Sequence, residues 1–428
     1  MPPRLHLSRM EVRSELYGPK INCARLLERH RAMAQVGATG RGGVNRQALT
    51  PADGEARRLL LSWTAGRGFV AEIDPIGNLF IRRPGEDSGL APVMTGSHLD
   101  SQPTGGNFDG VFGVLAGLEV LETLDDVGIV TKRPTELVVW MNEEGSRFAP
   151  ATMGSAVSAG AIELRTALET KDASGKSIQD ALADQLATLP RFEMRPLGTK
   201  GFAFVELHIE QGPVLETAGC QIGVVTGIQG MYLYDVQILG FEAHAGTTPS
   251  RSRQDALASA LSLITGLRLQ LSDPADTLRF TIGRLEVHPG SPNTVPGRVR
   301  FTIDLRHPDL DALKRAGRTI SEACNGTVER CSVTSRLVLQ SNPVQFDPGI
   351  VEVVRRATAR RQIKHMDIVS GATHDSLYMS SLTPTAMIFI PCERGISHNE
   401  AENVADEHLI VGGQVLCDTV VSLLTTKT

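Results

Sequence analysis

Three apolar stretches of this chain end in ionisable side chains, and this repeated pattern constrains the fold more than any other feature. Residues 91–98, 135–144 and 201–212 each begin like a buried strand and finish in histidine or acidic residues. A helix-like pattern over residues 111–124 lies between the first two, as expected for a strand–helix–strand crossover with parallel strands. Because ligands of open α/β sheets bind outside the carboxyl ends of the strands, we expect the three ends to meet at one site.

The pattern changes at about residue 227. Residues 227–337 are predicted to form strand, helix, two strands, helix and strand, an order typical of a ferredoxin-like α+β domain. The first pattern resumes after it. At roughly 150 residues per domain, 428 residues suggest two or three domains. We therefore predict an α/β catalytic domain with a mixed sheet, formed by residues 1–226 and 338–428 and interrupted by the inserted domain.

Charge and composition exclude several classes of function. The chain has 43 Lys+Arg against 48 Asp+Glu, which argues against nucleic acid and anionic membranes as partners. The N-terminus has no apolar signal-like core, and no stretch reaches the ~18 apolar residues of a membrane span. The six cysteines are far apart and form no CxxC pair, so we expect neither a disulfide framework nor a thiolate metal cluster. A cytoplasmic protein fits best.

Five side chains suited to metal binding lie at strand ends or glycine-rich turns. They are His98, Asp109, Glu144, His208 and His398. Histidines and carboxylates without a thiolate are the ligands of hydrolytic zinc, manganese or cobalt sites, with one or two metals. Each residue alone has a structural alternative: a strand-end histidine is often satisfied within the protein, and Asp109 could cap the helix that follows it. Their positions at the ends of successive elements favour a shared site.

Two further acidic features lie close to these residues. Glu143 and Glu144 repel each other, and a cation would compensate both, with one carboxylate as ligand and the other as general base. A solvated surface loop is the alternative. Asp100, two residues after His98, could accept the second N–H of that imidazole, and an Asx-turn is the alternative for this residue.

Taken in order, eight motifs resemble a known enzyme family. They are GSHLDS, GGNFDGVFGVLAGLEVL, NEEGSRF, HIEQGP, EAHAGTTP, PNTVPGRVRFTIDLRH, SGATHDS and GISHNEAE, between about residues 96 and 402. The set is similar to the zinc-dependent hydantoinase/carbamoylase amidases of the M20 metallopeptidase group. This resemblance implies a hydrolase that cleaves the ureido C–N bond of N-carbamoyl-L-amino acids to amino acid, ammonia and carbon dioxide. The alternatives are allantoate or another ureido acid as substrate, or a dipeptidase or deacylase of the wider group.

The resemblance also implies the metal ligands and the general base. One metal would be held by His98, Asp109 and His208, and the other by Asp109, Glu144 and His398. The two divalent ions per subunit would be zinc, with manganese, cobalt or nickel as alternatives. Glu143 would act as the general base that activates water.

The substrate contacts and the role of the inserted domain follow from the same resemblance. The substrate-binding residues would be Gln211, His244, Asn293, Arg306 and Gly371, with Arg306 pairing with the substrate carboxylate. The inserted domain would serve as lid and as dimerisation domain of a homodimer, and His244 would donate to the oxyanion in the partner subunit's active site. Without the surrounding motifs, each of these residues would be interpreted as ordinary turn or surface polarity.

One motif departs from the family pattern. SGATHDS, residues 370–376, stands where SGAGHDA is expected, so Thr373 replaces a glycine and Ser376 an alanine. A side chain at residue 373 predicts either a different turn or a smaller and more polar pocket, because glycine allows close approach and positive φ. Two other classes remain as alternatives. A binding protein with an inactive metal site would lack ligands or the base, and a nucleotide enzyme would need GxGxxG where this chain has GGNFDG.

Overall fold

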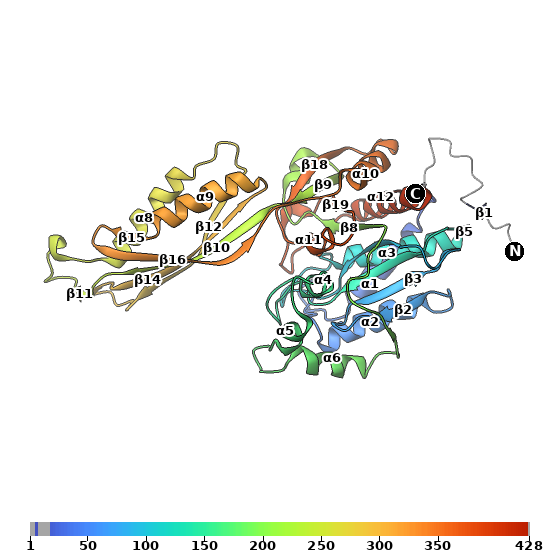
Figure 1. Cartoon of the computed structure of the whole chain (residues 1–428), viewed down its shortest axis with the longest axis horizontal. Helices are drawn as coiled ribbons and strands as arrows, with labels where there is room; N and C mark the ends of the chain where they lie inside the picture. Colours follow the sequence, from blue (N-terminus) through green and yellow to red (C-terminus); the bar gives the residue numbers. More distant parts are fainter. Residues whose placement is uncertain (1–4, 7–17, 427–428) are drawn as a thin grey trace. The chain divides into compact units, whose positions relative to one another are not determined.

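The computed structural model describes residues 5–6 and 18–426, and the chain divides into two compact units (Figure 1). Unit 1 comprises Met1–Gly227 and Phe346–Thr428, and unit 2 is Ile228–Gln345. Unit 2 is continuous in sequence and inserted into unit 1. Its strand β16 (Cys331–Ser341) remains paired as far as Ser341, so unit 2 ends later than residue 337.

Unit 1 is built on a mixed sheet with the strand order β17-β9-β19-β8-β4-β6-β3-β2-β7. Its central strands are parallel and fully buried: β19 (Thr385–Ile390), β8 (Ala203–Ile209), β4 (Val93–His98) and β6 (Thr135–Trp140). The outer strands are β17 (Val344–Gln345), β9 (Ile222–Ile228), β3 (Leu79–Arg83), β2 (Val70–Ile73) and β7 (Glu193–Met194), while β18 (His365–Ser370) pairs with β9. A separate pair is formed by β1 (Leu5–His6) and β5 (Ile129–Val130).

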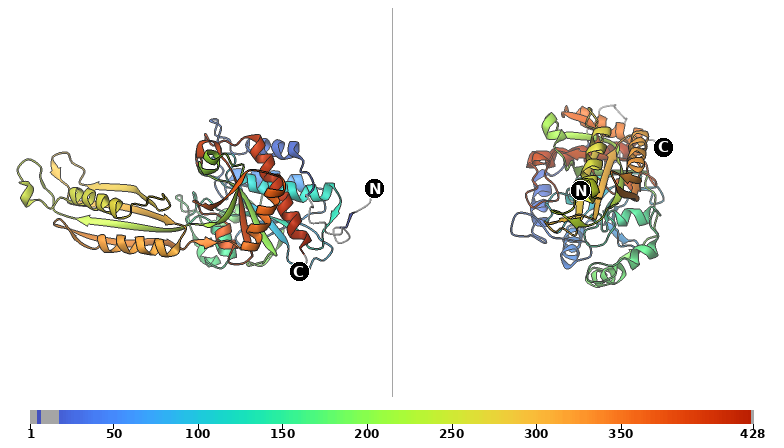
Figure 2. Two further views of the ribbon diagram at one scale, coloured as in Figure 1. Left: turned by 90° about the horizontal axis from the view of Figure 1, so that it is seen from above. Right: turned by 90° about the vertical axis from the view of Figure 1, so that its left-hand side faces the viewer.

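Helices cover the sheet of unit 1. They are α1 (Cys23–Met33), α2 (Pro51–Thr64), α3 (Val111–Asp126), α4 (Met153–Ser158), α5 (Leu164–Glu169), α6 (Ile178–Leu186), α7 (Val214–Ala218), α10 (Pro348–Arg360), α11 (Ser376–Met379) and α12 (Asp406–Thr425), with a 3-10 turn at Glu393–Gly395. Helix α3 packs on β4, β6 and β8, and α12 packs on β19, β8 and β4. Figure 2 shows α10 and α12, in orange and red, side by side.

Helix α12 is long and apolar enough, by length and composition alone, to cross a membrane. However, 72% of its most apolar window is buried inside the protein. A helix that is apolar on nearly all sides is expected in the core of a large domain, where both faces contact other elements. We therefore interpret α12 as a core helix of unit 1.

Unit 2 consists of an antiparallel sheet with two helices. In chain order its main elements are β10 (Gly230–Leu239), α8 (Ala256–Gln270), β12 (Arg279–His288), β14 (Arg298–His307), α9 (Leu310–Ala323) and β16. The sheet order is β12-β14-β10-β16-β15, where β15 is Gly326–Val328. Shorter pieces are β11 (Ala243–His244), β13 (Thr294–Val295) and a 3-10 turn at Ser250–Ser252.

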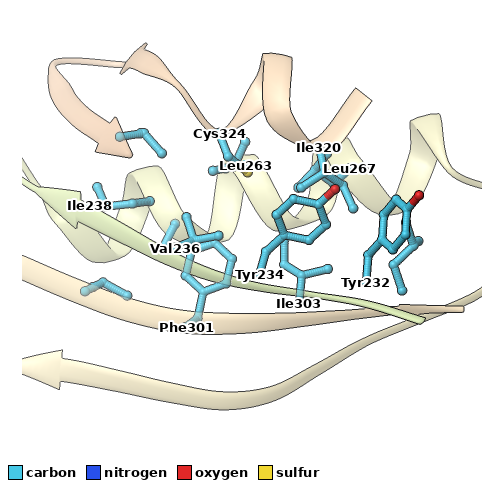
Figure 3. Packing of buried hydrophobic residues seen from close by; sticks show 14 of the residues in the cluster. Tyr232, Tyr234, Val236, Ile238, Leu263, Leu267, Phe301, Ile303, Ile320 and Cys324 are labelled. Atoms are coloured by element: carbon cyan, nitrogen blue, oxygen red, sulfur yellow. The ribbon is translucent and has the colours of Figure 1, made fainter. Parts of the chain in front are cut away.

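The core of unit 2 lies between its sheet and its two helices (Figure 3). Along β10, Tyr232, Tyr234, Val236 and Ile238 are buried, while the residues between them are half-buried. This alternation is expected for a strand with one face on a core, because successive side chains point to opposite faces. The helices contribute apolar residues such as Ile320 to the same cluster.

Candidate metal centre

The carboxyl ends of the central strands of unit 1 carry the predicted ligands. His98 is the last residue of β4, and His208 lies near the end of β8. Glu144 follows β6, Asp109 precedes α3, and His398 follows β19. Because β6, β4, β8 and β19 are neighbours in the sheet, their ends are adjacent. The structure therefore brings these five side chains together, as the strand pattern predicts.

Asp109 lies at the middle of this group, and its two carboxylate oxygens face different partners. Oδ1 lies 3.1 Å from Nε2 of His208 and 3.7 Å from Nε2 of His98. Oδ2 lies 3.3 Å from Nε2 of His398, which is itself 3.4 Å from Oε2 of Glu144. The ligand atoms within each of the two groups lie within 4.8 Å of one another. Asp109 could therefore contribute one oxygen to each of two cations, if both ligand groups held a metal.

The alternative role of Asp109 as a helix cap is not observed. The N-cap position of α3 is Gly110, and no side chain forms a cap hydrogen bond there. Gly110 has a φ of 67°, and a Cβ atom at this position would lie 2.3 Å from the His98 ring. Only glycine therefore lets the chain turn into α3 this close to a ligand.

The tautomers of the buried histidines suit metal binding. Nδ1 of His98 lies 2.9 Å from the backbone carbonyl oxygen of Asp100, and Nδ1 of His208 lies 2.9 Å from that of Ile209. A carbonyl oxygen only accepts hydrogen bonds, so Nδ1 carries the proton and, in the neutral ring, Nε2 presents a lone pair. Both lone pairs then face Asp109, an arrangement that a cation between them would stabilise. The donor set therefore fits divalent metal ions.

Several buried carboxylates lie close together at this site, and their raised pKa values also indicate a site suited to cations. Burial and the charge of Asp109 raise the pKa of Glu144 to about 8. Burial, with the charge of Asp109 next, raises the pKa of Glu402 to about 7. Burial, followed by the charges of Asp375 and Glu144, raises the pKa of Glu143 well above its usual value. Positive charge among these groups would let them ionise.

For two of the histidines, the surroundings favour the charged form, whereas for the carboxylates they favour the neutral form. Burial tends to lower the pKa of His208, but its hydrogen bond to Asp109 raises it to about 9. The hydrogen bond from His398 to Asp109 likewise raises the pKa of His398 to about 9. Burial of Asp109 opposes ionisation, yet His208 and His398 hold the pKa of its carboxyl well below the usual range. Without metal, the two histidines supply the positive charge that keeps Asp109 ionised, and divalent cations would supply it in their place.

Glu143 lies beside the first ligand group. Its Oε2 atom is 3.6 Å from Nε2 of His98, and the residue is only 7% exposed. A carboxylate at this distance from the ligand atoms, but with a raised pKa, can exchange a proton with a water molecule that binds among them.

Asp100 acts differently from the prediction. Its backbone carbonyl, not its carboxylate, accepts the N–H of His98 Nδ1, from which the carboxylate oxygen is 3.8 Å away. The carboxylate oxygens instead accept the backbone N–H groups of Glu143 and Glu144, at 3.2 and 3.1 Å. Asp100 therefore links β4 to the loop that carries Glu143 and Glu144. The reason is chain direction, since the backbone turns after His98 and points the carbonyl back at the ring.

Glu402 was not singled out from the sequence, although it lies in the GISHNEAE motif. One of its carboxylate oxygens accepts the backbone N–H groups of Phe108 and Asp109, at 2.9 and 3.1 Å. The other accepts the hydroxyl of Ser397 at 2.9 Å. Glu402 thus joins the loop before α3 to the loop that carries His398. An acidic residue four positions after a ligand was the available signal.

Gln211 lies next to the shared carboxylate. Its Nε2 atom donates to Oδ2 of Asp109 at 2.8 Å and lies 3.1 Å from Oγ of Ser397. Gln211 has a φ of 57°, so this side chain is presented from a tight turn after β8. The predicted substrate-binding residue is therefore at the candidate centre, in contact with Asp109.

A fully buried arginine, Arg46, also supports the centre, and no pattern in the sequence singles it out. Arg46 donates to the backbone carbonyls of Leu99 and Val36, both at 2.7 Å. Its own backbone N–H donates to Ser101 Oγ at 2.9 Å. Arg46 therefore fixes the segment that follows His98.

The SGATHDS turn does not need a glycine at residue 373, because the φ angle of Thr373 is not positive. The hydroxyl of Ser376 donates to Glu206 at 2.6 Å, and Ser97 donates to the other Glu206 oxygen at 2.8 Å. His374 packs edge-on against His208, with ring centroids 4.5 Å apart. Glu206, His208 and His374 could form a further ligand group by distance, but the Glu206 oxygens are already bonded to the two serines.

The remaining predicted residues lie in other segments. Gly371 is an exposed residue of the SGATHDS turn in unit 1. His244, Asn293 and Arg306 belong to unit 2. There, the backbone N–H of Ala245 donates to the carbonyl of Asn293 at 2.9 Å, so His244 and Asn293 are on neighbouring segments. Arg306 pairs with Asp304 at 2.8 Å on β14.

Comparison with known families and proteins agrees with this geometry. The model of Peptidase family M20/M25/M40 matches residues 94–422. The chain is 42% identical over 405 residues to an N-carbamoyl-L-amino-acid amidohydrolase of Rhizobium meliloti, covering 94% of this chain and 96% of that protein. It is 33% identical over 393 residues to the allantoate amidohydrolase of Bacillus subtilis, covering 91% and 95% of the two chains.

A solved structure gives the same result for the fold. The crystal structure of a hydantoinase/carbamoylase family amidase from Burkholderia multivorans is 42% identical to this chain, with a TM-score of 0.87. The match covers 96% of this chain and 99% of that one. The similarity therefore extends over both units.

Proposed function

The chain belongs to Peptidase family M20/M25/M40, and from this premise we propose that it is a metal-dependent amidohydrolase of N-carbamoyl-L-amino acids. It would cleave the ureido C–N bond with one water molecule and release the amino acid, ammonia and carbon dioxide. The observation that carries the proposal is the placement of Asp109 between two ligand groups, with Glu143 beside them. The names of the relatives supply the substrate class.

The residues divide the chemistry among them. Two divalent cations, when bound, would polarise the ureido carbonyl and make an attacking water more acidic. Glu143 would take a proton from that water and deliver it to the leaving nitrogen. Its buried position beside His98 supports this, because a carboxylate with a raised pKa holds a transferred proton more readily than an exposed carboxylate does.

We propose zinc as the metal, with manganese, cobalt or nickel as alternatives. Three histidines and two carboxylates supply borderline and hard ligands, which suit all four ions. None of the six cysteines belongs to the ligand groups, and all six are free thiols. Free thiols also support a cytoplasmic location, where disulfides are rare.

Substrate binding is proposed for Gln211, His244, Asn293, Arg306 and Gly371. Within unit 2, His244 follows the carboxyl end of β10, where Leu239 pairs with Arg298. Arg306 lies on β14 eight residues after Arg298, which at ~3.3 Å per residue places it roughly 26 Å from the end of the sheet near His244. One small substrate cannot contact both residues of one chain. This separation supports the proposal that His244 serves the active site of a partner subunit in a homodimer, while Arg306 binds the carboxylate in its own.

Unit 2 would then be both lid and dimerisation domain. Its order of two helices and four long strands, with β10 and β14 at the centre of the sheet, supports a ferredoxin-like assignment. Such a domain would carry His244 and Asn293 on one end of the sheet and Arg306 on the other.

A second candidate substrate is allantoate. The relative from Bacillus subtilis that is named for this substrate matches nearly the full length of both chains. Thr373 adds a hydroxyl group to the turn beside the predicted substrate carboxylate, and a more polar ureido acid could bond to it, whereas the buried Ser376 hydroxyl is already bonded to Glu206.

A substrate panel tests the proposal. Protein loaded with zinc, manganese or cobalt would be assayed for ammonia release from N-carbamoyl-L-amino acids, their D-enantiomers, allantoate and dipeptides. We expect the highest kcat/KM for an N-carbamoyl-L-amino acid. A higher value for allantoate would establish the second candidate, and no ammonia from any ureido compound would overturn the proposal.

A further inference from the structure

The ring of His244 is held in one orientation by its own backbone. Nδ1 lies 3.0 Å from the backbone N of Gly246 and 3.1 Å from that of Thr247, and both N–H groups donate to it. An Nδ1 that accepts two hydrogen bonds carries no proton, so the neutral ring holds its proton on Nε2. The tautomer of this exposed histidine is therefore set by the turn over residues 245–248.

The turn requires close approach of its backbone to the ring. A Cβ atom at Gly246 would lie 3.3 Å from Cε1 of His244, a tight contact that would displace the ring slightly. The turn is closed by the N–H of Thr248, which donates to the carbonyl of His244 at 3.1 Å. Residues 246 and 247 are exposed, and their N–H groups keep their direction only if the turn is fixed from elsewhere.

Arg253 supplies that restraint. Its Nε atom donates to the carbonyl of Thr248 at 2.9 Å, and its Nη2 atom donates to the carbonyl of Ala245 at 2.7 Å. These two carbonyls flank the two N–H groups that bond the His244 ring. Because the guanidinium is planar and always charged, its two bonds fix the spacing and orientation of the turn together.

We propose that Arg253 is a positioning residue that keeps His244 as an Nε2–H donor by holding both ends of the 245–248 turn. The inference rests on the proposed function for its catalytic consequence, since the donor would act on the substrate oxyanion. The contacts between Arg253, the 245–248 turn and His244 all lie within unit 2. Lysine could bond one carbonyl but not both with fixed geometry, so Arg253→Lys should have an intermediate effect.

The tautomer can be measured without turnover. In protein labelled with ¹⁵N-histidine, the His244 ring signals, assigned by their loss in His244→Gln, are expected to show Nε2 protonated and Nδ1 unprotonated. Arg253→Ala should give a mixture of tautomers, and Arg253→Lys a smaller change. Arg251→Ala, which removes an exposed arginine two residues earlier, should leave the signals unchanged. An unaltered single tautomer in Arg253→Ala would overturn the inference.

Kinetics then test the catalytic consequence. Loss of one oxyanion donor lowers kcat by about 10²- to 10³-fold, so Arg253→Ala, which retains the donor but frees it, should lower kcat by roughly 10- to 100-fold with KM little changed. The double variant Arg253→Ala/His244→Ala should be no slower than His244→Ala alone. Additive losses would contradict the inference. If the wild type hydrolysed no ureido compound, the proposed function would fail while the tautomer measurement still decided the role of Arg253.

Discussion

At the scale of single residues, the centre depends on how each side chain is restrained. Asp109 is fixed by Glu402 through its backbone and by Gln211 through its carboxylate. His98 and His208 are oriented by backbone carbonyls. Such restraints orient ligands before a metal binds and raise affinity for it. Glu143 belongs to neither candidate ligand group, so it can be replaced without removing a ligand.

Glu143→Gln provides the sharpest residue-level prediction. The amide is of similar size but cannot take up a proton, so ammonia release should fall at least about 100-fold. Metal content, measured by atomic emission, should remain near that of the wild type. Glu55→Gln changes an exposed side chain of α2 and serves as the matched control. Substantial remaining activity in Glu143→Gln would exclude this residue as the base.

Arg306 tests the proposed carboxylate contact. A hydrogen bond between charged groups contributes about 1.5–3 kcal/mol, so Arg306→Ala should raise KM for an N-carbamoyl amino acid by roughly 10- to 100-fold. Arg306→Lys should recover only part of this, because lysine cannot form the bidentate pair. Steady-state kinetics on the substrate and on its carboxamide analogue provide the comparison. A KM that is unchanged in Arg306→Ala would place the carboxylate elsewhere.

Sequence patterns predicted which side chains gather at the candidate centre better than they predicted the residues that restrain them. His98, His208 and Glu144 could be predicted because strand ends have a recognisable apolar-to-polar transition. The contacts of Glu402 and Arg46 could not, since they join segments far apart in sequence. The carboxylate of Asp100 was assigned to the wrong partner because a local spacing does not reveal which way a backbone carbonyl points.

At the scale of elements, the loop that carries His398 is tied to the loop before α3. Glu402→Ala would remove the bonds to Phe108 and Asp109. We expect metal affinity, measured by chelator competition, to fall about 10- to 100-fold, as is usual when a partner of a ligand is removed. Glu402→Gln should have a smaller effect, and Glu393→Ala, at an exposed position of the same loop, should have none. Wild-type affinity in Glu402→Ala would show that the two loops are held by other contacts.

Helix α1 contains a buried histidine that makes stability depend on pH. Burial, with the charges of Arg46 and Arg31, lowers the pKa of His30 to about 4. The ordinary value is 6.5, so between pH 6.5 and 4 the unfolded chain binds a proton that the folded protein does not. The contribution of His30 to stability should therefore fall as pH decreases through this window, by roughly 3 kcal/mol in total.

The measurement is the free energy of unfolding in urea, between pH 7 and 4, in the presence of a chelator. His30→Phe keeps the stacking on Phe108, whose ring centroid lies 4.6 Å from that of His30, but removes the titrating group. The pH slope of this variant should be smaller than that of the wild type. Equal slopes would mean that His30 titrates similarly in the folded and unfolded protein.

Long elements were predictable and short ones were not. The strands β4, β6 and β8 are continuous apolar runs, and α3 is long and apolar, so each has a clear pattern. The short helices α4 and α5 have six residues each, which is too few to establish a period of 3.6. Their positions are decided by tertiary packing around the loop after β6.

At the scale of the whole molecule, the two units have different proposed tasks. Unit 1 places the candidate metal ligands and Glu143 at the ends of its parallel strands. Unit 2 carries His244 and Arg306 at opposite ends of one sheet, which is why a homodimer is proposed. The order of elements in unit 2 is visible in the sequence, but the pairing of β10 with both β14 and β16 had to come from the structure.

We propose that ureido hydrolysis requires two cations on the side chains around Asp109. Metal-free protein would be titrated with zinc or manganese while ammonia release from an N-carbamoyl-L-amino acid is followed. We predict that activity is absent without metal and reaches its plateau at two equivalents per chain, and that Asp109→Asn, which weakens both ligand groups, shows little activity at any ratio. Full activity at one equivalent, or activity that survives complete chelation, would contradict the claim.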